Sequence, residues 1–266
     1  MDIEIPSTDG VTLQATLAGN WDRTDKIVLF VHGITSPSRD ESYGYFKRLA
    51  EKFAESGVAS LRFDARLHGK TTAPKDLTFT LRGLRDDIAA ARAAIGERAP
   101  AAAVSLFGLS MGGLGALSAP GDLPYDKIIL SAPVLDGWHV FGRDPAMVQA
   151  ARAGRTVDLY GVPIADAFFN EMASANVVNV LRYLRQHTLP VLLIHGTKDN
   201  VCPAKYVKSL LRSGGPQVTP LEMPGMGHLY PMADDEEDYN LWPRRPGSER
   251  NLATIAARSL AFLNGK

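Results

Sequence analysis

Short, continuously apolar segments recur along this chain, and they constrain its fold more than any other feature. Within each segment most residues are hydrophobic and no polar-apolar alternation is seen, so both faces of a strand formed there would be buried. The segments span residues 27–31, 58–63, 102–107, 127–130 and 191–194. Strands buried on both faces are typical of a parallel sheet covered by helices on each side. The recurring pattern therefore predicts an α/β fold.

Stretches with helical periodicity separate most of the apolar segments. Their hydrophobic positions recur at offsets of about 3, 4 and 7 residues, which gathers them on one face of a helix. Such stripes occur in residues 46–53, 81–95 and 252–263, and Pro203 stands where the first turn of another helix is expected. Residues 1–18 alternate instead around a turn-like segment, which predicts an antiparallel hairpin at the sheet edge.

The alternation of strands and helices stops between residues 134 and 187. Asp144-Pro145 is a helix start within this part, which is also rich in aromatic residues. The pattern indicates a small cap inserted into the sheet domain. We take Trp138 and Tyr160 as candidates for substrate contact, with the alternative that the aromatic residues form the core of the cap.

Length and composition favour one domain, residues 1–266, that carries this insertion. Of the 266 residues, 45% are hydrophobic and 22% are charged, so the chain can bury a large core. Its 29 basic residues balance 29 acidic ones. This balance argues against a nucleic-acid partner, which requires a basic surface. The sequence indicates no particular oligomeric state.

The sequence also lacks the signals of a membrane anchor, a disulfide and a metal site. We find neither a signal peptide nor an apolar stretch of membrane-spanning length. The single cysteine, Cys202, cannot form an internal disulfide, and no two histidines have the spacing of a helical metal site. We therefore expect a cytoplasmic protein without permanent membrane attachment, metal or cofactor.

A Gly-x-Ser-x-Gly motif follows the third apolar segment, with Ser110 at its centre. The motif runs from Gly108 to Gly112 and leads directly into a helix-compatible stretch. Glycines on both sides permit a tight turn from strand to helix, which would expose the serine hydroxyl at the carboxyl edge of the sheet. This context predicts a nucleophile, whereas the motif alone often occurs by chance.

A serine nucleophile needs a base to remove its proton and an acid to orient that base. Two later loops offer these groups. Asp199 follows the last apolar segment, and His228 follows the next short strand. Asp136 and Glu171 are rivals for the acid, but neither follows a buried strand. The chain order Ser110, Asp199, His228 is the one expected for a hydrolase with a nucleophile elbow.

With these motifs, the chain resembles the α/β-hydrolase superfamily over essentially its whole length. The matching segments are, in order, His32-Gly33, the Asp64–Gly69 loop, the Ser110 turn, and the loops of Asp199 and His228. The chain looks most like small-cap serine esterases and thioesterases, the group around cinnamoyl esterases and monoacylglycerol lipases. The resemblance implies an α/β-hydrolase fold, with a mostly parallel central sheet flanked by helices and a small inserted cap.

The resemblance also implies roles for individual residues. Ser110 would be the nucleophile, His228 the general base and then acid, and Asp199 the carboxylate that orients His228. The backbone N–H groups of Ile34 and Met111 would form an oxyanion hole. The implied reaction is hydrolysis of a carboxylic ester or thioester, a small molecule with a small to medium acyl or aryl-acyl group.

Two other functions are compatible with the same residues. An acyl group on the serine can pass to an amine, an alcohol or an internal carbon, which would make the protein an acyltransferase or cyclase. Some proteins of the superfamily act mainly as ligand receptors, although a pure binder has no need of a strained serine turn. The serine argues against epoxide hydrolases and dehalogenases, which use an aspartate at this position.

The chain departs from the family pattern in two places. Leu67 stands where glycine is common, and we expect it to hold the backbone there at negative φ. Residues 229–246 form an extra loop after His228 and contain an acidic run at 234–238. That run is either a solvated face or a source of charge that favours protonated His228.

The other histidines and the cysteine receive structural interpretations. His32 and His195 each precede a glycine at a strand end, where we expect them to hydrogen-bond to loop backbone. We expect His68 to brace its loop as well. His139 either contacts substrate or is an exposed residue of the cap. Cys202 is expected to pack in the interior.

Overall fold

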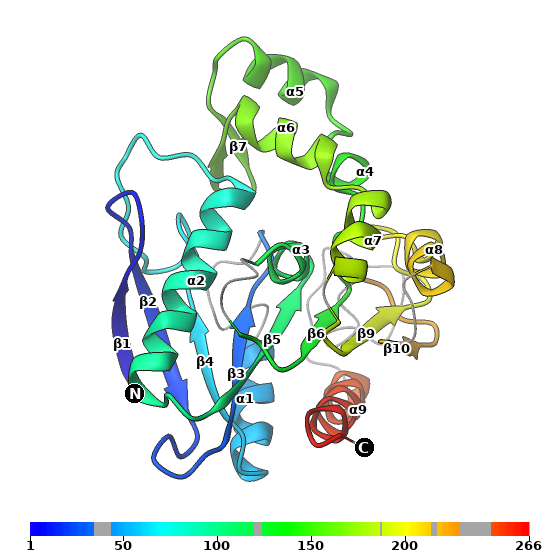
Figure 1. The fold of residues 1–266 in the computed structure, drawn as a ribbon. Coiled ribbons are helices and arrows are strands. Elements are labelled where there is room, and N and C mark those ends of the chain that lie inside the picture. The colour runs from blue at the N-terminus through cyan, green and yellow to red at the C-terminus, as the bar shows by residue number, and fades with distance from the viewer. Residues whose placement is uncertain (35–43, 120–123, 187, 214–216, 229–245, 266) are drawn as a thin grey trace.

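The computed structural model describes residues 1–34, 44–119, 124–186, 188–213, 217–228 and 246–265. Within these residues, eight strands form one mixed sheet and two more form a separate hairpin. The order across the large sheet is β1-β2-β4-β3-β5-β6-β9-β10. Helices flank the sheet, and an insertion stands at the top of the view in Figure 1. The predicted fold class is confirmed.

The five apolar segments form adjacent parallel strands at the centre of the sheet. They are β3 (Lys26–Val31), β4 (Ala59–Phe63), β5 (Ala103–Leu109), β6 (Ile128–Ser131) and β9 (Val191–Gly196). Successive side chains of a strand point to opposite faces. In β3, Val28 and Phe30 pack in one core cluster, and Ile27 and Leu29 pack in the other. Both faces are therefore buried, which explains why apolar residues predominate at successive positions of these strands.

The two edges of the sheet are built differently. At one edge, β1 (Asp2–Pro6) and β2 (Thr12–Ala18) form the predicted antiparallel hairpin, and β2 pairs antiparallel to β4. Asp9 and Gly10 turn this hairpin with φ of 59° and 71°. At the other edge, β10 (Val218–Met223) runs parallel to β9.

Helices from different parts of the chain cover the two faces. One core cluster includes α1 (Tyr45–Glu55) and α9 (Pro246–Leu263), and the other includes α2 (Leu81–Arg98), α3 (Met111–Leu117) and α8 (Ala204–Ser213). The predicted apolar stripes lie in α1, α2 and α9, and α8 begins directly after Pro203. Across the described parts of the chain, none of the helices has the length and apolar character needed to cross a membrane.

The insertion lies between β6 and β9. It consists of α4 (Gly137–Phe141), α5 (Pro145–Arg152), β7 (Val157–Leu159), β8 (Val162–Ile164), α6 (Asp166–Ser174) and α7 (Val177–Gln186). Phe141 and Phe169 both pack edge-on against Phe168, with ring centroids 5.4 and 5.6 Å away. The backbone N–H of Phe79 donates to the carbonyl of Pro163 at 2.8 Å. The insertion thus has an aromatic core and is tied to the loop before α2.

Candidate active site

Ser110 lies in the turn between β5 and α3, with φ 54° and ψ −116°. A positive φ is uncommon for a residue with a side chain. A Cβ at Gly112 would lie 2.1 Å from the carbonyl oxygen of Val31, and one at Gly108 would lie 2.4 Å from the carbonyl oxygen of Gly112. Backbone segments therefore approach too closely for any larger residue. The turn has the strained strand-to-helix geometry that the motif predicts.

His228 connects Ser110 with Asp199 in one hydrogen-bonded series. The Nδ1 atom of His228 is 2.9 Å from Asp199 Oδ2, and its Nε2 atom is 3.2 Å from Ser110 Oγ. An ionised carboxylate only accepts hydrogen bonds, so Nδ1 carries the proton and donates it to Asp199. Nε2 of the neutral ring is then the acceptor for the serine hydroxyl. The structure thus brings together the three residues that the sequence singled out.

Asp199 is held by the backbone of its own loop. Its side chain is buried, and its Oδ1 atom accepts hydrogen bonds from the N–H groups of Val201 at 3.0 Å and Cys202 at 2.8 Å. One carboxylate oxygen is therefore satisfied by the loop while the other faces His228. Such second contacts fix the orientation of a carboxylate and of the imidazole it holds.

The loop after β3 borders the serine. A Cβ at Gly33 would lie 3.3 Å from the Cβ of Ser110 and 3.8 Å from its Oγ. Ile34, the next residue, has a buried side chain, and so does Met111, the first residue of α3. The N–H groups in the first turn of a helix have no partner within the helix. The loop after β3 and the first turn of α3 therefore flank Ser110.

His32 and His68 connect this loop to the loop after β4. The N–H of Ala65 donates to His32 Nε2 at 3.0 Å, so the proton is on Nδ1, which is 2.8 Å from the carbonyl oxygen of Gly33. The ring of His68 contacts the carbonyl oxygens of Arg66 and Ile34, each at 2.7 Å. Burial, with a smaller effect of His68, lowers the pKa of His32 to about 3. Both histidines brace loops, as predicted.

His195 differs from the expected arrangement. Within the described residues, neither ring nitrogen of its buried side chain has a hydrogen-bond partner. Its Nδ1 atom lies 4.0 Å from Asp199 Oδ2, which is engaged by His228. Burial lowers the pKa of His195, against the opposing effect of Asp199. The predicted hydrogen bond to loop backbone was therefore wrong, and a neutral imidazole packs there instead.

Leu67 also departs from its prediction. We expected this residue to keep the backbone at negative φ, but its φ is 63°. The loop has the conformation that glycine would adopt easily, and leucine adopts it despite the cost. The half-buried Leu67 side chain packs against the main core cluster. Packing and the neighbouring backbone contacts of His68 offset the unfavourable conformation.

The two rivals for the acid have other partners. Asp136 caps α4, because its carboxylate accepts a hydrogen bond from the N–H of His139 at 2.8 Å. Glu171 accepts hydrogen bonds from the N–H groups of Leu81 at 2.6 Å and Arg82 at 3.0 Å, at the start of α2. No sequence signal indicates this second contact, since Glu171 and Leu81 lie 90 residues apart. Asp199 is thus the acid that reaches His228.

The aromatic candidates of the insertion lie outside this hydrogen-bonded group. Tyr160 turns the β7-β8 hairpin with φ 54° and is 75% exposed. Trp138 is 38% exposed, and the guanidinium of Arg152 lies 5.9 Å from the centre of its ring. His139 is half-buried against Tyr206 of α8, with ring centroids 5.3 Å apart. Neither predicted substrate contact has a partner in the Ser110 group.

Cys202 lies beside this group and is buried, as predicted. Its sulfur and one ligand atom each of Asp199 and His228 lie within 4.8 Å of one another, which is the one metal-compatible group in the described residues. Asp199 and His228 already bond to each other, and burial raises the pKa of the Cys202 thiol well above its usual value. A thiol that stays protonated is a poor metal ligand.

The loop after His228 lies outside the described residues. The extra loop was predicted at residues 229–246, with its acidic run at 234–238. All of these residues except Pro246, which begins α9, lie outside the described part of the chain. They therefore stay predictions.

A family comparison places the chain among hydrolases. Residues 22–162 match the family model described as serine aminopeptidase, S33. This span is more than half of the 266 residues. Among curated proteins, none matches the chain at a significant level.

Solved structures share the fold over nearly the whole chain. Est1E from Butyrivibrio proteoclasticus, solved with ferulic acid bound, is 21% identical, with a TM-score of 0.69 over 97% of this chain and 98% of that one. GrgF, an α/β hydrolase from Penicillium sp. sh18, is 17% identical, with a TM-score of 0.73 over 99% and 97%. An esterase from Exiguobacterium antarcticum is 18% identical, with a TM-score of 0.67 over 99% of this chain and 100% of that one. The chain has the α/β-hydrolase fold and belongs to the serine aminopeptidase S33 family.

Proposed function

We propose that this protein hydrolyses carboxylic esters or thioesters of small to medium acyl or aryl-acyl groups through an acyl-enzyme on Ser110. One observation carries the proposal: Ser110, His228 and Asp199 form a hydrogen-bonded series at a strained turn after a buried strand. Membership of a hydrolase family supports it. The same three roles recur on unrelated folds, which is why geometry weighs more than fold here.

In the proposed reaction, His228 Nε2 takes the proton of Ser110 as the serine oxygen attacks the carbonyl carbon. The resulting imidazolium donates that proton to the departing alcohol or thiol, and Asp199 stabilises it in the correct orientation. His228 then activates a water molecule, which hydrolyses the acyl group from Ser110 and returns the serine hydroxyl. The residues involved need no cofactor for this cycle.

The tetrahedral intermediate requires hydrogen-bond donors for its negative oxygen. We assign this role to the backbone N–H groups of Ile34 and Met111. The close approach of the Gly33 backbone to Ser110 supports the first assignment, and the position of Met111 at the start of α3 supports the second. Because main-chain groups would act here, substitution of the Ile34 side chain should affect turnover less than substitution of Ser110.

The insertion between β6 and β9 is the proposed cap that selects the acyl group. In Figure 1 it stands beyond the ends of β5 and β6, the side from which α3 begins. Ligands of α/β proteins bind outside the carboxyl ends of the strands. Est1E, which has the same fold, binds ferulic acid, so an aryl-acyl ester belongs among the substrates to be tested.

Turnover of a panel of chromogenic esters and acyl thioesters, including an aryl-acyl member, tests the proposal. Ser110→Ala should lower kcat/KM by at least about a thousandfold, since it removes the nucleophile. Ser105→Ala is the matched control, because it removes a buried hydroxyl from the same strand outside the hydrogen-bonded group. A clear optimum in acyl length would give the size of the cap pocket.

The same experiment separates the alternative functions. Near-normal turnover by the Ser110→Ala protein would refute the proposal. Acylation of Ser110 without turnover, detected as an increase in intact mass, would instead indicate an acyltransferase or cyclase that needs another acceptor. Absence of both acylation and turnover over the whole panel would indicate either an enzyme with an unusually narrow substrate range or a receptor.

A further inference from the structure

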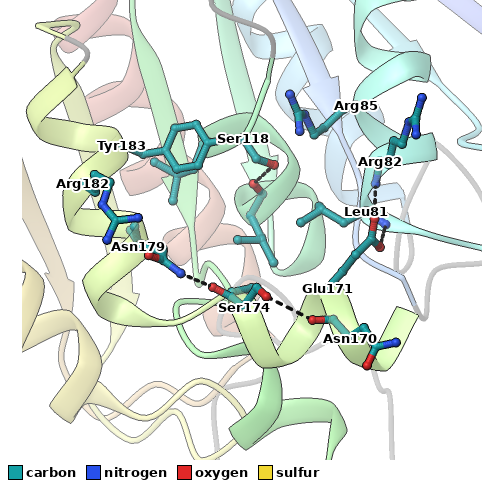
Figure 2. Close-up of a pocket in the computed structure, with 14 residues that line it drawn as sticks. Leu81, Arg82, Arg85, Ser118, Asn170, Glu171, Ser174, Asn179, Arg182 and Tyr183 are labelled. Atoms are coloured by element: carbon teal, nitrogen blue, oxygen red, sulfur yellow. Dashed lines mark hydrogen bonds between the residues drawn. The ribbon is translucent and has the colours of Figure 1, made fainter. Parts of the chain in front are cut away.

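A cavity of about 600 Å³ lies apart from the Ser110 group. Residues of α2, α3, α6 and α7 line it, and none of Ser110, Asp199 and His228 is among them. In Figure 2 side chains of α7 lie on one side, those of α2 on the other, and Ser118 between them. Its volume is within the range of cavities that hold small organic ligands.

The charge of the lining is strongly positive for a chain with zero formal net charge. Arg82 and Arg85 come from neighbouring turns of α2, and Arg182 comes from α7. Within the described part of the chain, no carboxylate forms a salt bridge with any of the three. Arg85 Nε is buried there without a hydrogen-bond partner. An anion bound in the cavity would supply these guanidinium groups with a partner of opposite charge.

Glu171 is the acidic residue of this lining, and its charge offsets that of the three arginines only in part. Both of its carboxylate oxygens accept hydrogen bonds from backbone N–H groups at the start of α2. Three positive side chains and one negative one leave an excess of two positive charges. The cavity therefore favours an anionic ligand.

The remaining lining is largely apolar. Leu114 and Leu117 of α3 and Val180 of α7 supply aliphatic surface, and Tyr183 supplies a ring. An inorganic anion would leave this surface in contact with water. A ligand with an anionic head and a hydrocarbon tail would use both parts of the lining.

We propose that this cavity is a second binding site, which takes a small amphiphile with a carboxylate or phosphate head and a short aliphatic tail. The positive charges of Arg85 and Arg182 attract the head, and the tail lies along Leu114 and Leu117. Because these leucines belong to the helix that begins at Met111, such a ligand would bind against the helix that follows the serine turn. The proposal does not rest on the esterase function.

Calorimetric titration of the Ser110→Ala protein tests the site without interference from turnover. Octanoate and octyl phosphate should bind with one-to-one stoichiometry, and the tighter of the two identifies the preferred head. Octan-1-ol and octylammonium should bind at least about tenfold more weakly, because they lack the negative charge. Equal affinity for octanoate and octan-1-ol, or no binding of either anion, would overturn the proposal.

Two variants of the arginines locate the bound anion. Arg85→Gln and Arg182→Gln should each weaken the binding of octanoate by roughly tenfold or more. Arg98→Gln is the matched control, since Arg98 lies in the last turn of α2 and bonds to the carbonyl of Ala94. Unchanged affinity in both test variants would show that the anion binds elsewhere. If Arg85→Gln does not fold, the exposed Arg182 carries the test alone.

Discussion

At the scale of single residues, the backbone conformations of Ser110 and Leu67 stand out. Both have positive φ without being glycine, and they lie in the loops that follow β5 and β4. Such conformations persist only where surrounding contacts hold them. At Ser110 the strain presents a hydroxyl to His228, whereas at Leu67 it places an apolar side chain on the core.

Replacing Leu67 by isoleucine should isolate the cost of its backbone conformation. The two side chains have the same volume, but a branched Cβ is far less compatible with positive φ. We expect the free energy of unfolding to fall by about 1 kcal/mol more than in Leu77→Ile, a half-buried control that packs on the same cluster. Urea denaturation measures both; equal losses would contradict the backbone explanation.

The buried His32 should make the fold sensitive to acid. Its pKa is about 3 in the fold against 6.5 for a free imidazole, so between these values the unfolded chain binds more protons. Stability should therefore fall as the pH falls from 6.5 towards 3, by up to roughly 1.4 kcal/mol per unit. His32→Gln removes this titrating group, so the free energy of unfolding of the variant should fall less steeply with decreasing pH. Urea denaturation at successive pH values measures both proteins. Parallel pH profiles would contradict the prediction.

At the scale of secondary structure elements, one buried ion pair joins three parts of the fold. Arg66, in the loop after β4, bonds to Asp87 of α2 through Nε at 3.1 Å and Nη2 at 2.9 Å. Its Nη1 atom reaches Asp9 in the turn of the edge hairpin at 3.1 Å. Although burial opposes the charge, Asp87 and Asp9 raise the pKa of Arg66. The edge hairpin, β4 and α2 are therefore connected by one side chain.

Asp87→Ala should leave the Arg66 guanidinium buried without its main partner. Breaking a buried pair in this way costs roughly 3 kcal/mol or more. Asp86→Ala is the control, because the Asp86 carboxylate makes one exposed contact, to Thr8 at 3.3 Å. We expect a change below about 0.5 kcal/mol there. Similar losses in the two variants, measured by urea denaturation, would show that the buried pair is not the cause.

Elements of the sheet were predictable because their local pattern carries the information. An apolar run buried on both faces and a helical stripe are visible in a single segment, and the observed bounds lie close to them. His195 and Leu67 were not predictable in this way. Their conformations depend on burial and on backbone groups of other loops, which no local pattern contains.

At the scale of the whole molecule, the insertion shares its hydrophobic core with the sheet domain. The ring centroids of Phe168 and Phe79 lie 6.2 Å apart, and both residues belong to the core cluster that contains Leu29 of β3. The Glu171 contact to the start of α2 adds a second connection. Such continuity favours cooperative unfolding of the described elements as one unit.

A single unfolding transition is therefore expected. The substitutions Trp21→Phe and Trp242→Phe leave Trp138 in α4 as the one tryptophan of the chain. Its fluorescence should then change at the same urea concentration as the far-UV circular dichroism. The reason is that the insertion cannot lose its packing without exposing the core beneath it. An earlier transition of Trp138 would show instead that the insertion unfolds independently.

The candidate catalytic group was predictable from the topology of the whole sheet, whereas the cavity lined by Arg85 and Arg182 was not. In parallel sheets the carboxyl ends of strands meet at one edge, so residues that follow successive strands converge. By this rule the sequence alone predicts that Ser110, Asp199 and His228 lie together. Arg85 and Arg182 belong to helices nearly a hundred positions apart in the chain, and no topological rule relates their side chains.

The glycines around the serine turn also determine where this protein can be changed by directed evolution. Added Cβ atoms at Gly108, Gly112 and Gly113 would lie 2.4, 2.1 and 2.8 Å from other atoms, two of these being backbone carbonyl oxygens. Saturation libraries at these positions would consist almost entirely of unfolded variants. Exposed positions such as Trp138 carry no such restriction, so substitutions selected for new substrates are best tolerated in the insertion.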